Sequence, residues 1–342
     1  LGWSATAERT LSSAFWVATE HRDHRTAAEA ATELTSVVGL SRGRPQQGLE
    51  WSRLARSARG QVSADRPETA AWLAATGTVL RAAGRLDAAA DHLDRAIGQC
   101  EAPESADDLA CATAMITQGL VRESQRHNDE ARALFNGARR IHQKVLGPLH
   151  PQVARDLTDL ARVEQADGRH DDALAEQQRV LALHEANRSG PVLVAGAHND
   201  IARTLRQLGR YDEARTYLER ALTQLELLRA SSRSHQKAEG QRIGPVLAEL
   251  GKLALLQGDL RESSAHFRRG VALVAEANGP DHPSQSPFEL GLGEVALRRG
   301  QLEAARVHYR RARNLAAGTG DPDVTLAAAE AGLAAVTAAS RR

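Results

Sequence analysis

Apolar residues recur every three to four positions along most of the chain, as they do on one face of an α-helix. The stretch 196–225 shows this pattern most clearly. Ile201, Leu205 and Leu208 lie on one face of a first helix, and a second apolar face with similar spacing follows Gly209. Glycine adopts the left-handed backbone conformation that ends a helix, so Gly209 marks a turn. We therefore predict a hairpin of two amphipathic helices, which needs neighbouring hairpins to bury both apolar faces.

The hairpin pattern repeats along the chain with a period of about 42 residues. The turn markers are Gly43, Gly84, Arg126, Gly168, Gly209, Gly258 and Gly300. Seven positions before each of the last six markers stands a small residue: Gly77, Gly119, Ala161, Ala202, Gly251 and Gly293. Nine positions after the same markers stand Leu93, Phe135, Gln177, Leu218, Phe267 and Tyr309, all large and apolar or aromatic except Gln177. A large residue filling the gap beside a small one is typical of stacked helical hairpins.

This spacing of small and large residues resembles the tetratricopeptide repeat. The loops L-G-P-L-H-P (146–151) and N-G-P-D-H-P (278–283) occupy the same phase of the repeat and resemble those of the kinesin-light-chain type. The resemblance implies an all-α fold, a right-handed solenoid of stacked antiparallel helix hairpins. We expect a single repeat domain over residues 1–342 with about seven hairpins. A final Ala-rich helix over residues 323–340 is expected to cap the open end.

The N-terminal segments 1–16 and 27–39 add a second resemblance. They are similar to the repeat region that follows the catalytic domain in certain large bacterial serine/threonine protein kinases. Because the chain begins with Leu1 rather than Met, we expect it to be a fragment of a longer chain. The resemblance implies that a kinase domain lies upstream.

Composition and charge exclude several classes of function. The formal net charge of +1 provides no global field for nucleic acid. The sequence contains no run of 18 apolar residues, the length that a helix needs to span a membrane. We expect a cytoplasmic location, or an extracytoplasmic one if a membrane span lies upstream. Cys100 and Cys111 flank one loop, so a bridge between them is sterically conceivable, although two buried thiols are the favoured interpretation. The 49-residue spacing between Gly209 and Gly258 predicts an insertion, which we assign to a mobile loop at 231–240.

Motifs that suggest catalysis lack the context that catalysis needs. His21-Arg22-Asp23 imitates a kinase catalytic loop, but Ala28 stands where that loop needs Asn. The histidines have no zinc-ligand spacing, and His150 and His282 are predicted to form hydrogen bonds in the loops between repeats. We predict that this chain is not an enzyme and has no catalytic residue, metal or cofactor.

The remaining candidate is a peptide-binding groove, because the resemblance implies that the first helix of each hairpin lines a concave face. By position, the groove would contain Arg155, Thr158, Arg162, Gln165, Asn199, Arg203, Arg206 and Lys252. Arginine pairs well with carboxylate and phosphate, so the partner is expected to be an acidic or phosphorylated peptide. The alternative is that these side chains only solvate exposed helix faces.

Three functions follow from these patterns. The first is an interaction scaffold that binds partner peptides within a larger signalling protein. The second is the non-catalytic C-terminal part of a serine/threonine kinase, recruiting its substrates. The third is a structural or oligomerisation array.

Overall fold

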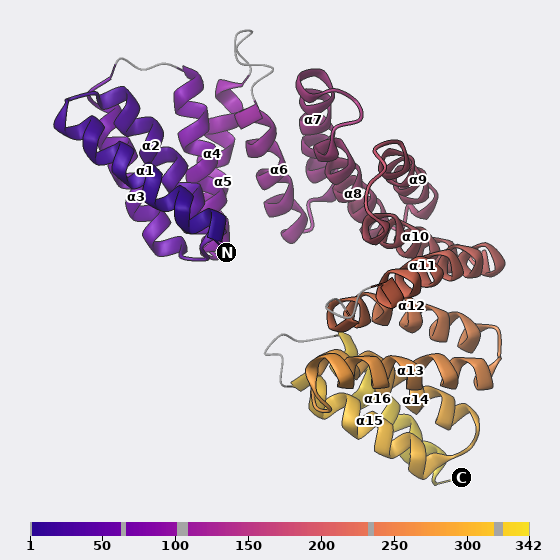
Figure 1. The fold of residues 1–342 in the computed structure, drawn as a ribbon. Coiled ribbons are helices and arrows are strands. Elements are labelled where there is room, and N and C mark those ends of the chain that lie inside the picture. Colours follow the sequence, from indigo (N-terminus) through magenta and orange to yellow (C-terminus); the bar gives the residue numbers. More distant parts are fainter. Residues whose placement is uncertain (1, 63–65, 101–108, 232–235, 318–323, 342) are drawn as a thin grey trace. The chain divides into compact units, whose positions relative to one another are not determined.

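The computed structural model describes residues 2–62, 66–100, 109–231, 236–317 and 324–341. Within these ranges the chain forms α-helices, two short η segments, turns and no strand, which confirms the all-α prediction (Figure 1). The helices are α1 (Gly2–Glu20), α2 (His24–Ser36), η1 (Val37–Ser41), α3 (Pro45–Arg59), α4 (Arg66–Ala82), α5 (Leu86–Gln99), α6 (Leu109–Ser124), α7 (Asn128–Leu146), α8 (Pro151–Ala166), α9 (His170–Ala186), α10 (Pro191–Gln207), α11 (Tyr211–Ser231), α12 (Gln236–Leu256), α13 (Leu260–Asn278), η3 (Pro283–Gln285), α14 (Ser286–Arg298), α15 (Leu302–Ala317) and α16 (Val324–Ala339).

The chain divides into two compact units, unit 1 at residues 1–169 and unit 2 at residues 170–342. Unit 1 contains α1 to α8, and unit 2 contains α9 to α16. Each is a series of antiparallel helices. The prediction of one continuous repeat domain over the whole chain stays a prediction.

The residues chosen as turn markers share one backbone conformation. Gly209 has φ of +74°, and all seven markers have positive φ. Arg126 adopts φ of +64° although it has a side chain, a conformation that costs an L-residue roughly 1–2 kcal/mol. Each marker therefore ends one helix and redirects the chain into the next.

The small and large residues of the repeat pattern contact each other. A Cβ added at Gly251 would lie 2.5 Å from Cε1 of Phe267, and one added at Gly291 would lie 2.4 Å from the same ring. The ring is therefore held between α12 and α14. Tyr309 has the same relation to Gly293, where an added Cβ would lie 2.7 Å from its ring. The absence of side chains at these glycines lets successive helices pack around one aromatic ring.

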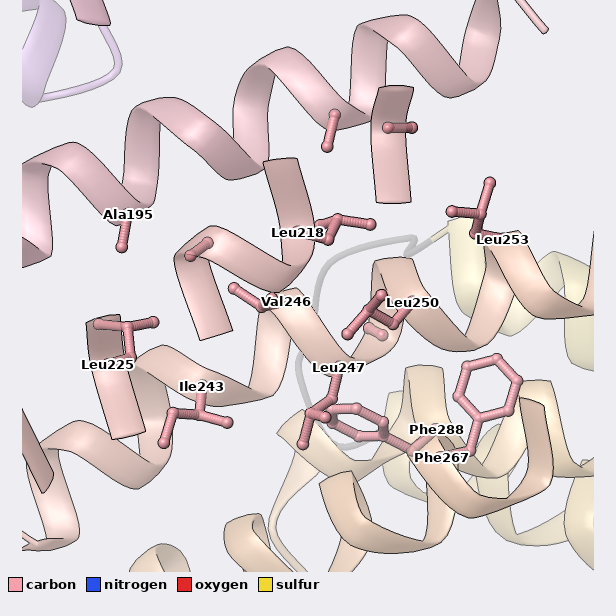
Figure 2. Packing of buried hydrophobic residues seen from close by; sticks show 14 of the residues in the cluster. Ala195, Leu218, Leu225, Ile243, Val246, Leu247, Leu250, Leu253, Phe267 and Phe288 are labelled. Carbon is pink, nitrogen blue, oxygen red and sulfur yellow. The ribbon is translucent and has the colours of Figure 1, made fainter. Parts of the chain in front are cut away.

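The core of unit 2 follows the predicted apolar faces (Figure 2). Ile201, Leu205 and Leu218 each have an exposed fraction of 1% or less, and Ala214 is fully buried. Ile243 and other side chains of α12 continue this core toward Phe267 and Phe288. These positions are buried because neighbouring helices cover the apolar face of each helix.

Two predictions are corrected by the structure. Cys100 and Cys111 form a disulfide between the end of α5 and the start of α6, rather than two free thiols. Their Cα atoms are 5.8 Å apart, a separation at which a disulfide forms without moving the backbone. The predicted loop at 231–240 is also wrong in part, because α12 begins at Gln236. Gln, Lys, Ala and Glu at 236–239 are good helix formers, while residues 232–235 lie outside the described residues.

Candidate functional site

The predicted groove residues lie in two groups, one in each unit. Helix α8 of unit 1 carries Arg155, Thr158, Arg162 and Gln165. In unit 2, α10 carries Asn199, Arg203 and Arg206, and α12 carries Lys252. The convergence of both groups on one groove stays a prediction.

In unit 2, three of the four predicted residues line one pocket of about 580 Å³, which we call the polar pocket, whereas Arg206 lies outside its lining. Asn199 and Arg203 of α10 line it opposite Lys252 of α12. The other lining residues are Gly244, Pro245, Ala248, Glu249, Val274, Asn278, His282, Ser284, Pro287 and Phe288. The packing of α10, α12, α13 and the segment 282–284 thus places polar groups from different repeats around one space.

A second pocket of about 440 Å³ begins at Lys252 and Pro287, which line both spaces. Its walls come from α12, α14 and α16 and are mainly apolar, with Leu255, Leu290 and Leu297 among them. An extended chain bound in the polar pocket would therefore have an apolar surface beside it.

Glu249 is the central charged group of the polar pocket. Its side chain is 9% exposed and holds two cations, with Arg206 Nε 2.9 Å from Oε2 and Lys252 Nζ 2.8 Å from Oε1. Burial acts to raise the pKa of Glu249, but the charges and hydrogen bonds of Lys252 and Arg206 outweigh it and lower that pKa. Glu249 is therefore a carboxylate at neutral pH, and both cations are already paired.

Arg203 is paired as well, but at the surface. Its Nη2 lies 3.2 Å from Asp200 Oδ1, and the two side chains are 42% and 40% exposed. Burial raises the pKa of Asp200, and the charge of Arg203 opposes that rise. The neighbouring Asn199 has a buried amide oxygen with no hydrogen-bond partner in the described part of the chain.

The group on α8 has the same arrangement. Arg162 pairs with Glu123 of α6 and, at 2.6 Å, with Asp159 one turn earlier. Burial and the charge of Asp156 raise the pKa of Asp159 to about 6, although Arg155 opposes the rise. The hydroxyl of Thr158 donates to the carbonyl of Ala154 at 2.8 Å, within its own helix. Arg155 is exposed and Gln165 is partly exposed.

Sequence reasoning identified the cations and missed their carboxylate partners. An acidic residue stands three positions before Arg162, Arg203 and Lys252, at Asp159, Asp200 and Glu249. Residues three apart are neighbours on a helix, so this spacing was the available signal. The groove predicted as basic is therefore largely neutralised by its own helices.

The loop histidines and the kinase-like triplet have structural roles. His150 Nδ1 accepts a hydrogen bond from the backbone N–H of Gln152 at 3.2 Å, and His282 Nδ1 accepts one from Ser284 at 3.3 Å. Each histidine caps the helix that follows it, which confirms the predicted hydrogen-bonding role. Asp23 caps α2 by accepting from the backbone N–H of Thr26 at 3.1 Å.

Comparison with known proteins supports a repeat architecture. Models described as tetratricopeptide repeat match residues 40–106, 109–186, 194–223 and 244–318. A search of curated proteins found no match. Among the described residues, none of the helices combines the length and the apolar character required to cross a bilayer.

Solved structures with the same fold cover most of the chain. BtubC (BKLC) from P. vanneervenii has a TM-score of 0.59 at 16% identity, over 66% of this chain and 90% of that one. A putative kinesin light chain from Podosopora anserina has a TM-score of 0.52 at 18% identity, over 60% and 96%. The STAND protein PH0952 from Pyrococcus horikoshii, with a tetratricopeptide repeat sensor, has a TM-score of 0.67 at 14% identity, over 90% and 43%. At these identities the likeness is one of fold.

Proposed function

Because the chain belongs to the tetratricopeptide repeat family, whose members generally mediate protein–protein interaction, we propose that it binds a partner protein through the polar pocket of unit 2. The observation that carries this proposal is the joint lining of one pocket by Asn199, Arg203 and Lys252. The polar lining of this pocket and the adjoining apolar pocket suit an extended peptide, which offers backbone polar groups and side chains at regular intervals.

The charges of the polar pocket favour an acidic segment. Arg203 and Lys252 line the pocket with one carboxylate, Glu249, so one positive charge is left over. Arg203 and Lys252 are the accessible cations, with side chains 42% and 45% exposed. A carboxylate of the partner would complete the charge balance and accept hydrogen bonds from either cation.

The test is binding of an array of acidic peptides to the protein and to the double variant Arg203→Glu and Lys252→Glu. Charge-assisted hydrogen bonds are worth about 1.5–3 kcal/mol each, so we expect at least about a hundredfold loss of affinity. Arg306→Glu is the matched control. Arg306 is 44% exposed and paired at 2.5 Å with Glu303, three residues earlier, and it lines neither pocket. Equal capture by the double variant and the wild type would refute the proposal.

A further variant tests whether the binding surface extends into unit 1. Replacing Arg162 together with Arg203 by Glu removes one predicted cation from each unit. A loss larger than that of Arg203→Glu alone is expected if both groups line one groove. The same loss as with Arg203→Glu alone would restrict the site to unit 2.

We further propose that this region is a regulatory or targeting part of a larger signalling protein, with the C-terminal part of a serine/threonine kinase as the specific candidate. The support is the resemblance in segments 1–16 and 27–39. A kinase catalytic loop in the reading frame upstream of Leu1 is the expected finding, and a different upstream domain would refute the kinase assignment. If the region is instead an oligomerisation array, light scattering will show a mass that rises with protein concentration.

The disulfide favours the extracytoplasmic alternative for the location. Disulfides persist in oxidising compartments and are reduced in most cytoplasms, and Cys100 and Cys111 are joined here. Thiol alkylation of protein from its native source, without reduction, followed by mass spectrometry tests this assignment. Two alkylated cysteines would restore the cytoplasmic prediction.

A further inference from the structure

Glu249 differs from the other charged groups of the polar pocket because it is buried and has two cationic partners on different helices. Arg206 reaches it from α10 and Lys252 from the next turn of α12. A ligand oxygen bonded to Lys252 Nζ would lie within about 6 Å of the Glu249 carboxylate, since each bond spans about 2.8 Å. Any anion that enters the pocket therefore approaches a fixed negative charge.

The charge balance depends on Glu249. With Glu249 present, the lining holds two cations, Arg203 and Lys252, and one carboxylate, so the pocket has a net charge of +1. The flanking Arg206 and Asp200 lie outside the lining and have opposite charges. His282 also lines the pocket, and its Nδ1 accepts the backbone N–H of Ser284. One carboxylate from a ligand neutralises the pocket, whereas a phosphomonoester, with a charge of about −1.5 to −2 at pH 7, exceeds it.

As the charge of a ligand increases, the cost of removing it from water grows faster than its attraction to the pocket. Attraction to the fixed charges rises in proportion to the ligand's charge, but the cost of removing an ion from water rises with the square of that charge. A pocket of net charge +1 therefore suits a single carboxylate better than a dianion. Removal of the Glu249 charge would raise the net charge to +2, which matches a dianion.

We propose that Glu249 is a specificity-determining residue that makes the polar pocket select carboxylate-bearing segments and reject phosphorylated ones. The inference rests on the proposed function, since it concerns the ligand of the same pocket, and it narrows the partner to an acidic, unphosphorylated segment. Glu249 acts by pairing with Lys252, a cation that a phosphate would otherwise bind, and by keeping a negative charge beside it.

The experiment compares three versions of one array peptide whose capture requires Arg203 and Lys252. Each residue of this peptide is first replaced by Asn to find the position at which replacement weakens capture most. That position is then made Asp, Asn or phosphoserine. The affinities of the three peptides for the wild type and for Glu249→Gln are measured by isothermal titration calorimetry. The wild type should bind the Asp version at least as tightly as the phosphoserine version. Glu249→Gln should raise the ratio of phosphoserine to Asp affinity at least about tenfold. A tenfold wild-type preference for phosphoserine, or an unchanged ratio in the variant, would overturn the proposal.

Glu289→Gln is the matched control for loss of a buried carboxylate. Glu289 is 6% exposed and also has two partners, His308 Nδ1 at 2.7 Å and Arg311 Nε at 3.0 Å, but it lies outside the polar pocket. Glu289→Gln should leave the affinity ratio unchanged. An equal change of the ratio in both variants would assign the effect to unit 2 as a whole and overturn the proposal.

A second measurement tests selectivity without any peptide. Inorganic phosphate and acetate are titrated into the wild type and Glu249→Gln at pH 7.5, and the melting temperature is followed. Phosphate should stabilise Glu249→Gln more than acetate does, and the wild type should show no such preference. The array can lack any peptide whose capture depends on Arg203 and Lys252 while the two proteins still differ in their response to phosphate. In that case the proposed function fails and the role of Glu249 stands. Equal responses of both proteins to phosphate would overturn the role of Glu249.

Discussion

The contact between Gly251 and Phe267 leads to a prediction about paired substitutions. A methyl group at Gly251 would meet the ring at 2.5 Å, so Gly251→Ala overpacks the contact. Overpacking costs about 1–3 kcal/mol, and the better helix propensity of Ala recovers about 1 kcal/mol. We therefore expect a net loss of about 1 kcal/mol in the free energy of unfolding for this substitution alone.

Phe267→Leu has the opposite defect, because it leaves space beside Gly251. It removes three buried carbons, at about 0.8 kcal/mol each, so the expected loss is about 2 kcal/mol. The combination of Gly251→Ala and Phe267→Leu should lose less than the sum of the single losses, by about 1–2 kcal/mol. The preceding repeat shows that the combination packs well, since Ala202 and Leu218 occupy the same positions and are each 1% exposed.

Equilibrium unfolding in urea, followed by circular dichroism at 222 nm, measures all four proteins of this cycle. Circular dichroism is the appropriate signal because all four tryptophans, at 3, 16, 51 and 72, lie in unit 1 and their emission does not report unit 2. Gly258→Ala is a useful contrast. An added Cβ there meets nothing within 4 Å, so any loss comes from the positive φ of +82° and should not couple to Phe267→Leu. Additive losses for Gly251→Ala and Phe267→Leu, within about 0.5 kcal/mol, would refute the packing argument.

Three further predictions concern burial, the disulfide and pH. Ala214→Leu should cost about 1–3 kcal/mol by overpacking a fully buried position, and an unchanged urea midpoint would contradict the assigned phase of the repeat. Cys100 and Cys111 are 11 residues apart, and replacing both by Ser should cost about 3 kcal/mol because the unfolded chain loses its cross-link. Dithiothreitol should then lower the melting temperature of the wild type but not of the variant. The pKa of Asp159 is raised from 3.8 to about 6, so the folded state binds the proton of this carboxyl more tightly than the unfolded state does. The stability that this proton contributes is therefore lost as pH rises from about 4 to 6. Asp159→Asn should therefore flatten stability over this range, whereas an unchanged pH profile would show that Asp159 is not the group responsible.

Local features of this protein could be predicted from the sequence because each depends on residues close together in the chain. The turn at Gly209 needs only a residue that tolerates positive φ. The burial of Ile201 and Leu205 follows from helical periodicity. His150 and His282 cap helices that begin at the next residue, so their role is local as well.

The pairing of small and large residues was predictable for a related reason. Gly251 and Phe267 stand sixteen positions apart in one hairpin, and their relation recurs in each repeat. The second glycine against the Phe267 ring, Gly291, belongs to the next hairpin and was not identified. Its role depends on how hairpins stack, which one repeat does not specify.

The pairing of charges between helices at the candidate site was decided only by the tertiary structure. The sequence located Arg206 and Lys252 on helix faces, and from those positions alone the groove was predicted to be basic. The structure places Glu249, 43 residues after Arg206, between both cations. The spacing of Glu249 and Lys252 on one helix was visible in the sequence, but the pairing of Arg206 with Glu249 joins two helices and is known only when they are packed, because electrostatic interactions act through space. The same holds for the disulfide, because oxidation to a bridge requires the two Cα atoms to lie within about 7 Å, a distance that the packing of α5 against α6 sets.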